Sequence, residues 1–302
     1  MNIIETQHLT RRFGRMEAVH DLNLAVPTGS VFALLGPNGA GKSTTIKVLM
    51  NLLAPTTGTA RVMDVDSRQL GERQLAQIGY VSENQQLPLW MTVRQLLNYC
   101  RPFYPTWDRD LESTLLARFA LPEHQKLSRL SRGMLMKAAL LSSLAYRPKL
   151  LVLDEPFSGL DAVVRDEFIR GVLEVSERGE WTVLVSSHDI EEVERLCDHV
   201  ALIDGGRLRL SEPAEALQAR FRRVEVTAAS AEVRPQPAWV EWERAGALTR
   251  FVETRYAGGP TEAAWRGHFG EVRIVAHPMT LREIFMALAR SGTASLATEA
   301  TA

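Results

Sequence analysis

Cysteine is scarce in this chain of 302 residues, which has only Cys100 and Cys197, far apart and in no ligand-spaced pattern. This scarcity argues against a disulfide framework or a zinc site and predicts a reduced, cytoplasmic protein. No apolar run approaches the roughly 18 residues of a membrane-spanning helix, and Met1-Asn-Ile-Ile-Glu-Thr6 lacks the basic start and apolar core of a signal peptide. If the protein serves a membrane process, we expect another chain to cross the bilayer.

An excess of charge of either sign is also absent, because 35 Lys and Arg residues balance 36 Asp and Glu residues to a net charge of −1. This balance argues against nucleic acid as the main partner. Arg220, Arg222 and Arg223 form the nearest basic cluster, which we interpret as a solvated helix end. The length predicts about two domains, and 45% hydrophobic with 24% charged residues is ordinary for a globular protein with a sizeable core.

What the chain does contain is a glycine-rich motif, Gly36-Pro-Asn-Gly-Ala-Gly-Lys-Ser43, which fits G-x-x-x-x-G-K-[ST] at every fixed position. Val31 to Leu35 predicts a buried strand before it, and Thr44 to Leu53 predicts a helix after it. The glycines leave room for backbone N–H groups to converge on phosphate oxygens, and the helix N-terminus adds partial positive charge. We expect Lys42 to reach the β- and γ-phosphates and Ser43 to bind Mg²⁺. The residues expected to hold the nucleotide here are Gly36, Pro37, Asn38, Gly39, Ala40, Gly41, Lys42, Ser43 and Thr44.

A second motif, Leu150-Leu-Val-Leu-Asp-Glu-Pro156, places two carboxylates directly after an apolar run. The run predicts a buried strand whose carboxyl end meets the ligand, where open α/β sheets place their sites. We expect Asp154 to hold Mg²⁺, directly or through water, and Glu155 to take a proton from an attacking water. Two adjacent carboxylates are often only an exposed loop start, but their position downstream of a phosphate loop favours the functional interpretation.

His188 and Ser131 complete the candidate site. Thr182 to Ser186 predicts another strand, so we expect His188 at the same sheet edge as Glu155, where it could contact the γ-phosphate and orient the attacking water. A histidine without this context would be interpreted as structural or exposed. Ser131, in Leu130-Ser-Arg-Gly-Met134, opens a predicted helix whose N-terminus could offer N–H groups to an anion, although simple capping also explains this serine.

The remaining pattern predicts an α/β core with a helical insertion, followed by a smaller domain. Asp161 caps a helix expected over residues 161–177, and His199 to Leu210 has the signature of a hairpin. Beyond the hairpin, residues 212–221 and 280–289 predict helices, and residues 223–227 and 248–256 predict strands. We therefore expect a nucleotide-binding domain at 1–220 with a helical subdomain at about 84–146, an α+β accessory domain at 221–290 and a flexible tail at 291–302.

The order and residues of these elements resemble the ATP-binding subunits of ABC transporters over Met1 to about Leu210. The resemblance implies a P-loop NTPase core of the ABC ATPase type, with an antiparallel β subdomain and the α-helical insertion, in addition to the small C-terminal α+β domain. It implies ATP and Mg²⁺ as cofactors and ATP hydrolysis coupled to transmembrane transport. It also implies a head-to-tail dimer, either a homodimer or a heterodimer with a second ABC ATPase, that sandwiches two ATP molecules.

Individual residues carry roles over from the family. Its signature sequence, LSGGQ, corresponds to Leu130-Ser-Arg-Gly-Met134, which keeps the Ser and the second Gly but departs at the third and fifth positions. Ser158-Gly-Leu-Asp161 matches the loop that passes between the two sites. Phe13 matches the aromatic residue that stacks on adenine, although it could be simple core filler. In the family the signature binds the γ-phosphate held by the opposite subunit, which implies that role for Ser131, Arg132, Gly133 and Met134.

A further departure follows the apolar segment Ile78 to Ser82. The family usually has a Gln there that touches Mg²⁺ and the attacking water, whereas this chain has Glu83. A carboxylate can still coordinate Mg²⁺, and it adds negative charge near the γ-phosphate, so we expect activity to survive. Gln85 could take the place of the family residue if the loop shifts.

The short ATPase with this signature and a C-terminal domain resembles the bacterial exporter branch, in which integral membrane permease subunits are separate chains. This implies a cytoplasmic protein, peripheral at the inner face of the cell membrane, with no nucleic acid partner. In that branch the helical insertion and the loop around Glu83 receive a coupling helix from the permease. Trp90 and Met91 are candidates near that contact, or they fill the core of the insertion. A soluble ABC ATPase in translation or repair and a nucleotide-sensing regulator of a membrane partner are the alternative hypotheses.

Overall fold

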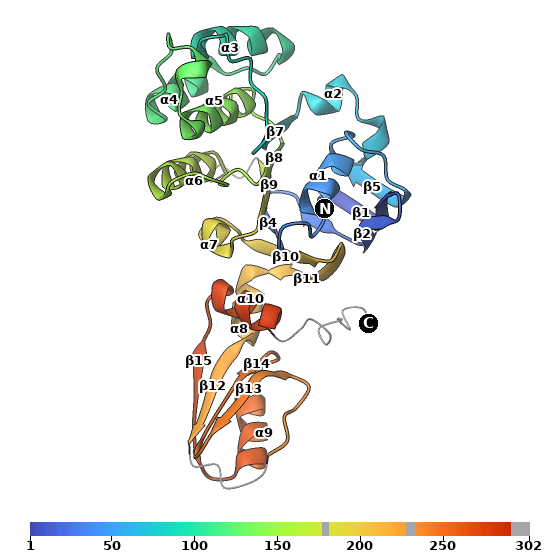
Figure 1. Ribbon diagram of the computed structural model, residues 1–302, viewed down its shortest axis with the longest axis vertical. Coiled ribbons are helices and arrows are strands. Elements are labelled where there is room, and N and C mark those ends of the chain that lie inside the picture. Colours follow the sequence, from blue (N-terminus) through green and yellow to red (C-terminus); the bar gives the residue numbers. More distant parts are fainter. Residues whose placement is uncertain (177–180, 228–232, 291–302) are drawn as a thin grey trace. The chain divides into compact units, whose positions relative to one another are not determined.

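The computed structural model describes residues 1–176, 181–227 and 233–290. The chain divides into two compact units, Met1–Ser211 and Glu212–Ala302. Figure 1 draws the first unit in blue to yellow and the second in orange to red. The expected tail at 291–302 and the last residue of the helix expected at 161–177 lie outside the described residues.

A six-stranded sheet with the order β11-β10-β4-β9-β8-β7 forms the centre of the first unit. Neighbouring strands from β10 to β7 pair in parallel. Every residue of β4 and β8 is buried, as expected of parallel strands covered on both faces. The strands and the hairpin predicted here are confirmed. The six strands span Val31–Leu35 (β4), Ile78–Ser82 (β7), Leu150–Asp154 (β8), Thr182–Ser187 (β9), His199–Asp204 (β10) and Arg207–Pro213 (β11).

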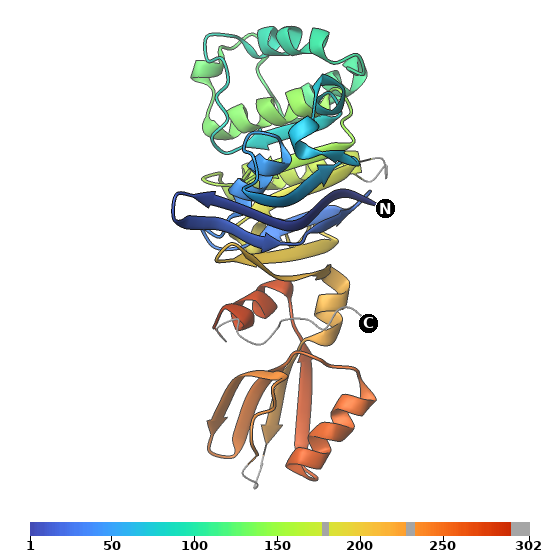
Figure 2. The same ribbon diagram turned by 90° about the vertical axis from the view of Figure 1, so that its right-hand side faces the viewer.

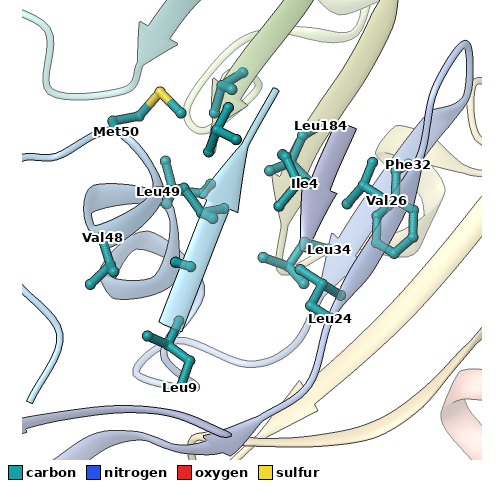
Figure 3. Close-up of a cluster of buried hydrophobic side chains, with 14 of the residues drawn as sticks. Ile4, Leu9, Leu24, Val26, Phe32, Leu34, Val48, Leu49, Met50 and Leu184 are labelled. Carbon is teal, nitrogen blue, oxygen red and sulfur yellow. The ribbon is translucent and has the colours of Figure 1, made fainter. Parts of the chain in front are cut away.

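An antiparallel sheet with the order β2-β1-β5-β6, in which β3 also pairs with β1, lies beside the central sheet (Figure 2). Apolar side chains from both sheets and from α1 (Lys42–Leu49) form one buried cluster. Figure 3 shows Ile4 and Val26 of the antiparallel sheet near Leu34 and Leu184 of the central sheet. The strands of this sheet span Asn2–Phe13 (β1), Met16–Leu22 (β2), Ala25–Pro27 (β3), Thr57–Val62 (β5) and Val65–Asp66 (β6).

Helices flank the central sheet on both faces. Helix α1 lies on the side of the antiparallel sheet, whereas α5, α6 and α7 lie on the other side (Figure 1). The insertion between β7 and β8 is helical, as predicted, and Tyr146 ties it to the sheet by donating its hydroxyl to the Ile78 carbonyl at 2.8 Å. These helices span Glu72–Leu75 (α2), Val93–Cys100 (α3), Arg109–Arg118 (α4), Arg132–Leu144 (α5), Ala162–Ser176 (α6) and Ile190–Val193 (α7), with 3-10 turns at Ser67–Gln69, Arg101–Phe103 and Leu127–Arg129.

The second unit contains a four-stranded sheet with the order β13-β14-β12-β15. Trp265 and Phe269 of α9 pack with Trp239 and Phe251 of the sheet into a separate aromatic core. Glu253 is buried, and its Oε2 accepts hydrogen bonds from the indole N–H groups of Trp239 and Trp265. The elements span Arg222–Thr227 (β12), Trp239–Ala245 (β13), Leu248–Glu253 (β14), Gly259–Phe269 (α9) and Arg273–Pro278 (β15).

Two further helices of the second unit, α8 (Ala214–Arg220) and α10 (Leu281–Arg290), pack against each other. The sequence predicts a domain boundary after Arg220. The structure divides after Ser211, and α8 packs against α10 within the second unit.

Candidate nucleotide-binding site

The strands of the central sheet end level with one another at their carboxyl edge. In the register of the parallel pairs, Ser82 of β7 lies opposite Asp154 of β8, and Asp154 lies opposite Ser186 of β9. On the other side of β9, Ser187 lies opposite Leu35, the last residue of β4, and the phosphate loop begins at the next residue. The topology therefore brings the phosphate loop, the adjacent carboxylates and His188 to one edge, as the sequence predicted.

The phosphate loop approaches distant parts of the backbone closely. Gly41 has a φ of 105°, and a Cβ atom there would lie 2.4 Å from the carbonyl oxygen of Ala18. A Cβ atom at Gly36 would lie 2.1 Å from the carbonyl oxygen of Ile203. The sequence motif predicts these glycines from the room that a phosphate needs. The structure adds a second reason, because side chains at Gly36 and Gly41 would collide with the protein's own backbone. Helix α1 begins at Lys42, within the motif and earlier than predicted.

Lys42 is almost fully buried beside this loop, with 4% of its side chain exposed. Its Nζ lies 2.7 Å from the carbonyl oxygen of Gly36 and 3.1 Å from that of Pro37. The third partner is Oε1 of Glu155, at 3.0 Å. A buried ammonium group needs such partners, because an unpaired charge away from water is costly. These contacts hold the positive charge beside the loop.

Asp154 is buried at the end of β8, where its Oδ1 accepts hydrogen bonds from the hydroxyls of Ser43 and Ser186, each at 2.8 Å. Ser186 also accepts a hydrogen bond from the backbone N–H of Glu155 at 3.0 Å. Glu155 has a φ of 50°, a left-handed conformation that costs a residue with a side chain about 1–2 kcal/mol. Ser186 therefore holds the carboxylate of Asp154 and the backbone of Glu155. No sequence motif assigns Ser186 a role, and the only signal for one is a polar residue near the end of an apolar strand.

Ser43 and Asp154 fit a magnesium ion. They present a hydroxyl and a carboxylate oxygen 2.8 Å apart, and Mg²⁺ prefers oxygen ligands, to which substrate phosphates and waters usually contribute. Within residues 1–176, 181–227 and 233–290, no group of three or more His, Cys, Asp or Glu side chains could hold a metal ion by itself. The pair therefore suits an ion whose coordination a phosphate completes.

His188 lies next to the carboxylate of Glu155, with its Nδ1 2.8 Å from Oε2. The preceding Ser187 hydroxyl hydrogen-bonds to Glu192, whose carboxyl pKa is raised by burial. This buried contact supports the turn that presents His188. Glu155 thus has the imidazole at one oxygen and the Lys42 ammonium at the other, so three candidate residues are in direct contact.

The signature residues lie at the N-terminus of α5. Ser131 is exposed and caps α5, where its Oγ accepts a hydrogen bond from the Met134 N–H at 3.3 Å. Figure 1 shows α5 on the opposite side of the central strands from α1. Gly133 is buried against α6, since a Cβ atom there would lie 2.8 Å from Cγ1 of Val164. The expected capping role of Ser131 is therefore confirmed.

The remaining candidates divide between surface and core. Phe13 ends β1 with 41% of its surface exposed, and the guanidinium carbon of Arg11 lies 4.6 Å from its ring centre, so it is not core filler. Asp161 caps α6 by accepting a backbone hydrogen bond at 2.9 Å. Trp90 is 69% exposed, whereas Met91 is buried. Met91 therefore fills the core of the insertion, the second of the two roles expected for it, and does not form a contact surface.

Similarity to known proteins identifies the family of this chain. Residues 19–158 match the family model described as ABC transporter. The chain is 35% identical over 223 residues to the probable multidrug ABC transporter ATP-binding protein YbhF of Escherichia coli (strain K12), which covers 72% of this chain and 38% of YbhF. It is 32% identical over 209 residues to the Nod factor export ATP-binding protein I of Rhizobium leguminosarum bv. viciae, which covers 68% of this chain and 67% of that protein. The chain belongs to the ABC transporter ATP-binding proteins.

Members of this ABC family hydrolyse ATP to power transport. A solved ATP-binding subunit of an ABC transporter is similar to the chain with a TM-score of 0.65 and 26% identity, covering 72% of this chain and 92% of that one. The P-loop NTPase fold expected from the sequence is thereby confirmed. The chain spans 38% of the length of YbhF. Among the helices of the described residues, none is both long and apolar enough to cross a bilayer.

Two departures from the ABC family pattern lie in contact with each other. Oε1 of Glu83 accepts hydrogen bonds from the Ser158 hydroxyl and from Nη2 of Arg132, each at 2.7 Å. The bond from Ser158 and the charge and hydrogen bond of Arg132 lower the pKa of Glu83 below its usual value. The Glu83 backbone N–H donates to the Asp154 carbonyl at 3.0 Å, so the backbone of Glu83 lies beside that of a candidate metal ligand. Gln85, the alternative to Glu83, is exposed on the loop.

Proposed function

We propose that this chain is the ATP-binding and ATP-hydrolysing subunit that powers a membrane ABC transporter, an exporter, through an ATP-sandwich dimer. One observation carries the proposal: residues from three separate motifs meet in direct contact at one sheet edge. Lys42 contacts Glu155, and Glu155 contacts His188. Ser43 contacts Asp154 beside them. This set supplies a cation for phosphate, an oxygen pair for a metal ion and a base for water.

The residues of the chain divide the work of hydrolysis. The loop N–H groups and Lys42 bind the β- and γ-phosphates. Ser43 and Asp154 would hold Mg²⁺, which supplies charge neutralisation on the phosphates when it is bound. Glu155 accepts a proton from the attacking water, and His188 orients that water toward the γ-phosphate. Because contacts within the chain already hold these groups in place, little reorganisation is needed for reaction.

A second protomer completes the site in this proposal. Ser131 and Arg132, at the start of α5, are exposed, and α5 lies on the opposite side of the central strands from α1, which follows the phosphate loop. A helix N-terminus offers N–H groups and partial positive charge to an anion. In a homodimer, or in a heterodimer with a second ABC ATPase, the Asp161 loop passes between the two sites and Phe13 stacks on adenine. The residues proposed to reach the γ-phosphate of the partner protomer's ATP are Ser131, Arg132, Gly133 and Met134.

Separate permease chains are the proposed membrane partners. A groove of about 420 Å³ lies between the loop after β7 and α5, with Leu87, Leu89 and Met136 in its lining. Leu89 and Trp90 are 50% and 69% exposed. Exposed apolar side chains beside a groove are typical of protein contact surfaces. The names of the two relatives refer to multidrug transport and Nod factor export, which favours export and a place at the inner face of the cell membrane.

The variant Glu155→Gln tests the catalytic part of the proposal. It should still bind ATP, lose about 10²- to 10⁴-fold in turnover because the proton acceptor is gone, and accumulate an ATP-bound dimer that size-exclusion chromatography with light scattering detects. Glu72→Gln, at an exposed position in α2, is the matched control and should keep its turnover. Near-normal turnover of Glu155→Gln would assign the base to another residue.

Purification of the tagged chain from its own cells tests the transport part. A polytopic membrane protein should co-purify with it. A soluble ABC ATPase acting in translation or repair would purify with ribosomes or nucleic acid instead. A nucleotide-sensing regulator would bind a membrane partner and ATP without measurable turnover.

A further inference from the structure

Three loops of the first unit meet at one carboxylate oxygen. Oε1 of Glu83, after β7, accepts hydrogen bonds from Arg132 at the start of α5 and from Ser158 in the loop after β8, each at 2.7 Å. The side chain of Arg132 also covers Gly159, where a Cβ atom would lie 2.8 Å from Nη1. The Arg132 guanidinium, which is part of the signature, therefore contacts two other loops. One is the loop of Glu83, which is proposed to reach the metal ion. The other is the loop of Ser158 and Gly159, which is proposed to pass between the two nucleotides.

The ion pair between Arg132 and Glu83 is weak enough to be exchanged. The two side chains are 50% and 31% exposed, whereas those of Lys42 and Glu155 are 4% and 12% exposed. An exposed ion pair contributes little free energy to the folded state, because water solvates both charges and salt screens them. A triphosphate carries several negative charges and offers a guanidinium two oxygens at once. It is therefore the stronger partner for Arg132.

We propose that Arg132 is a positioning residue for Glu83, and that it exchanges this carboxylate for the γ-phosphate of the ATP held by the partner protomer. The inference rests on the ATP-sandwich dimer proposed above. In the open state Arg132 holds Glu83 against Ser158. On closure it moves to the phosphate and releases the carboxylate beside Asp154, whose carbonyl already accepts the Glu83 N–H. ATP at one site thereby changes the charge available to the metal at the other, so the two sites bind ATP cooperatively.

A double-mutant cycle tests this exchange. In a Glu155→Gln background, which stops hydrolysis, the ATP concentration for half-maximal dimer formation is measured by light scattering at saturating Mg²⁺. Glu83→Gln should lower this concentration about two- to fivefold, the factor that corresponds to an exposed ion pair, because Arg132 no longer has to leave a carboxylate. Arg132→Gln should raise the concentration and lower the Hill coefficient. When Arg132→Gln is already present, adding Glu83→Gln should have no further effect.

Two further variants sharpen the cycle. Arg132→Lys keeps the cation and should restore most of the wild-type Hill coefficient. Arg129→Gln removes an exposed arginine outside the signature and should change neither quantity. If Glu83→Gln changes the ATP concentration by the same factor with and without Arg132→Gln, the two residues act independently and the exchange is overturned, while the dimer stands. If no variant forms an ATP-dependent dimer, the proposed function fails, and the exchange fails with it.

Discussion

Two regions of the protomer differ in how their polar groups are held. One is the carboxyl edge of the central sheet around Lys42, Asp154 and Glu155, which we call the phosphate edge. The other is the start of α5 at Ser131 and Arg132, which we call the signature edge. At the phosphate edge, Lys42, Asp154 and Glu155 are buried or nearly so, and each has hydrogen-bond or ion-pair partners within the chain. At the signature edge, Ser131 and Arg132 are exposed, and their contacts are a helix cap and an ion pair open to water. One edge is fixed by the fold, whereas the other keeps its groups accessible to a second molecule.

This difference indicates how a site shared between two chains can be built. Groups that take part in bond cleavage must be held in precise positions, and neighbouring strands of one sheet hold them so. Groups supplied to a partner must be stable in water before the partner arrives. A helix cap and a surface ion pair meet that requirement, because neither buries an unpaired charge. Substitutions at the two edges should therefore differ in size and in the protomer that they affect.

The largest of the effects that separate the two edges should come from Asp154→Asn at the buried edge. The neutral amide removes the buried negative charge beside Mg²⁺ and leaves the hydroxyls of Ser43 and Ser186 without a charged acceptor, so turnover should fall about 10²-fold or more. Steady-state ATPase assays over a Mg²⁺ titration measure this loss. Asp110→Asn, at an exposed position in α4, is the control. Wild-type turnover with unchanged Mg²⁺ dependence would place the metal elsewhere.

Ser131→Ala at the exposed edge should have a smaller effect, and in trans. In a mixed dimer with one Lys42→Ala protomer, only the other protomer has a working phosphate loop. Ser131→Ala on the Lys42→Ala protomer should reduce turnover about tenfold or more, because a hydroxyl that bonds a charged phosphate is lost. The same change on the other protomer should cost much less. Equal losses in both arrangements would mean that Ser131 acts only as the cap of α5.

Glu83 contacts both edges, through Arg132 and Asp154, and Glu83→Gln should have the smallest effect on turnover of the three variants. The amide can still accept a hydrogen bond and coordinate a metal ion through its oxygen, and the lost ion pair is exposed. Turnover at saturating ATP should stay within about fivefold of wild type, as measured by steady-state ATPase assays beside the Glu72→Gln control. A much larger rise would identify Glu83 as an inhibitory element.

The phosphate edge could largely be predicted from the sequence, because contiguous motifs carry it. The carboxyl ends of parallel strands meet at one edge, so the adjacent carboxylates and His188 could be assigned to the phosphate loop from local patterns. The role of Ser186 could not, because it depends on which strand neighbours β8 and in what register. The pairing of Glu83 with Arg132 spans 49 positions and depends on the packing of α5 against β7.

The second unit shows the same limit more strongly. The segments predicted at 212–221, 223–227, 248–256 and 280–289 correspond to α8, β12, β14 and α10. The elements β13, α9 and β15 are not among the predicted segments. In the order β13-β14-β12-β15, β13 and β14 are neighbours in sequence, but β12 pairs with β14 and β15, which are distant from it, and local propensity contains no information about such distant pairing.

The close approaches at the phosphate loop bear on what the motif can do outside its protein. Ala18 lies in β2 and Ile203 in β10, so the backbone of two segments remote in sequence packs against the loop and maintains its conformation between Gly36 and Gly41. A synthetic peptide of residues 36–43 would lack both walls and would relax to other conformations. Affinity for a triphosphate is therefore a property of the tertiary structure. Transferring the motif to another protein would also require segments equivalent to β2 and β10.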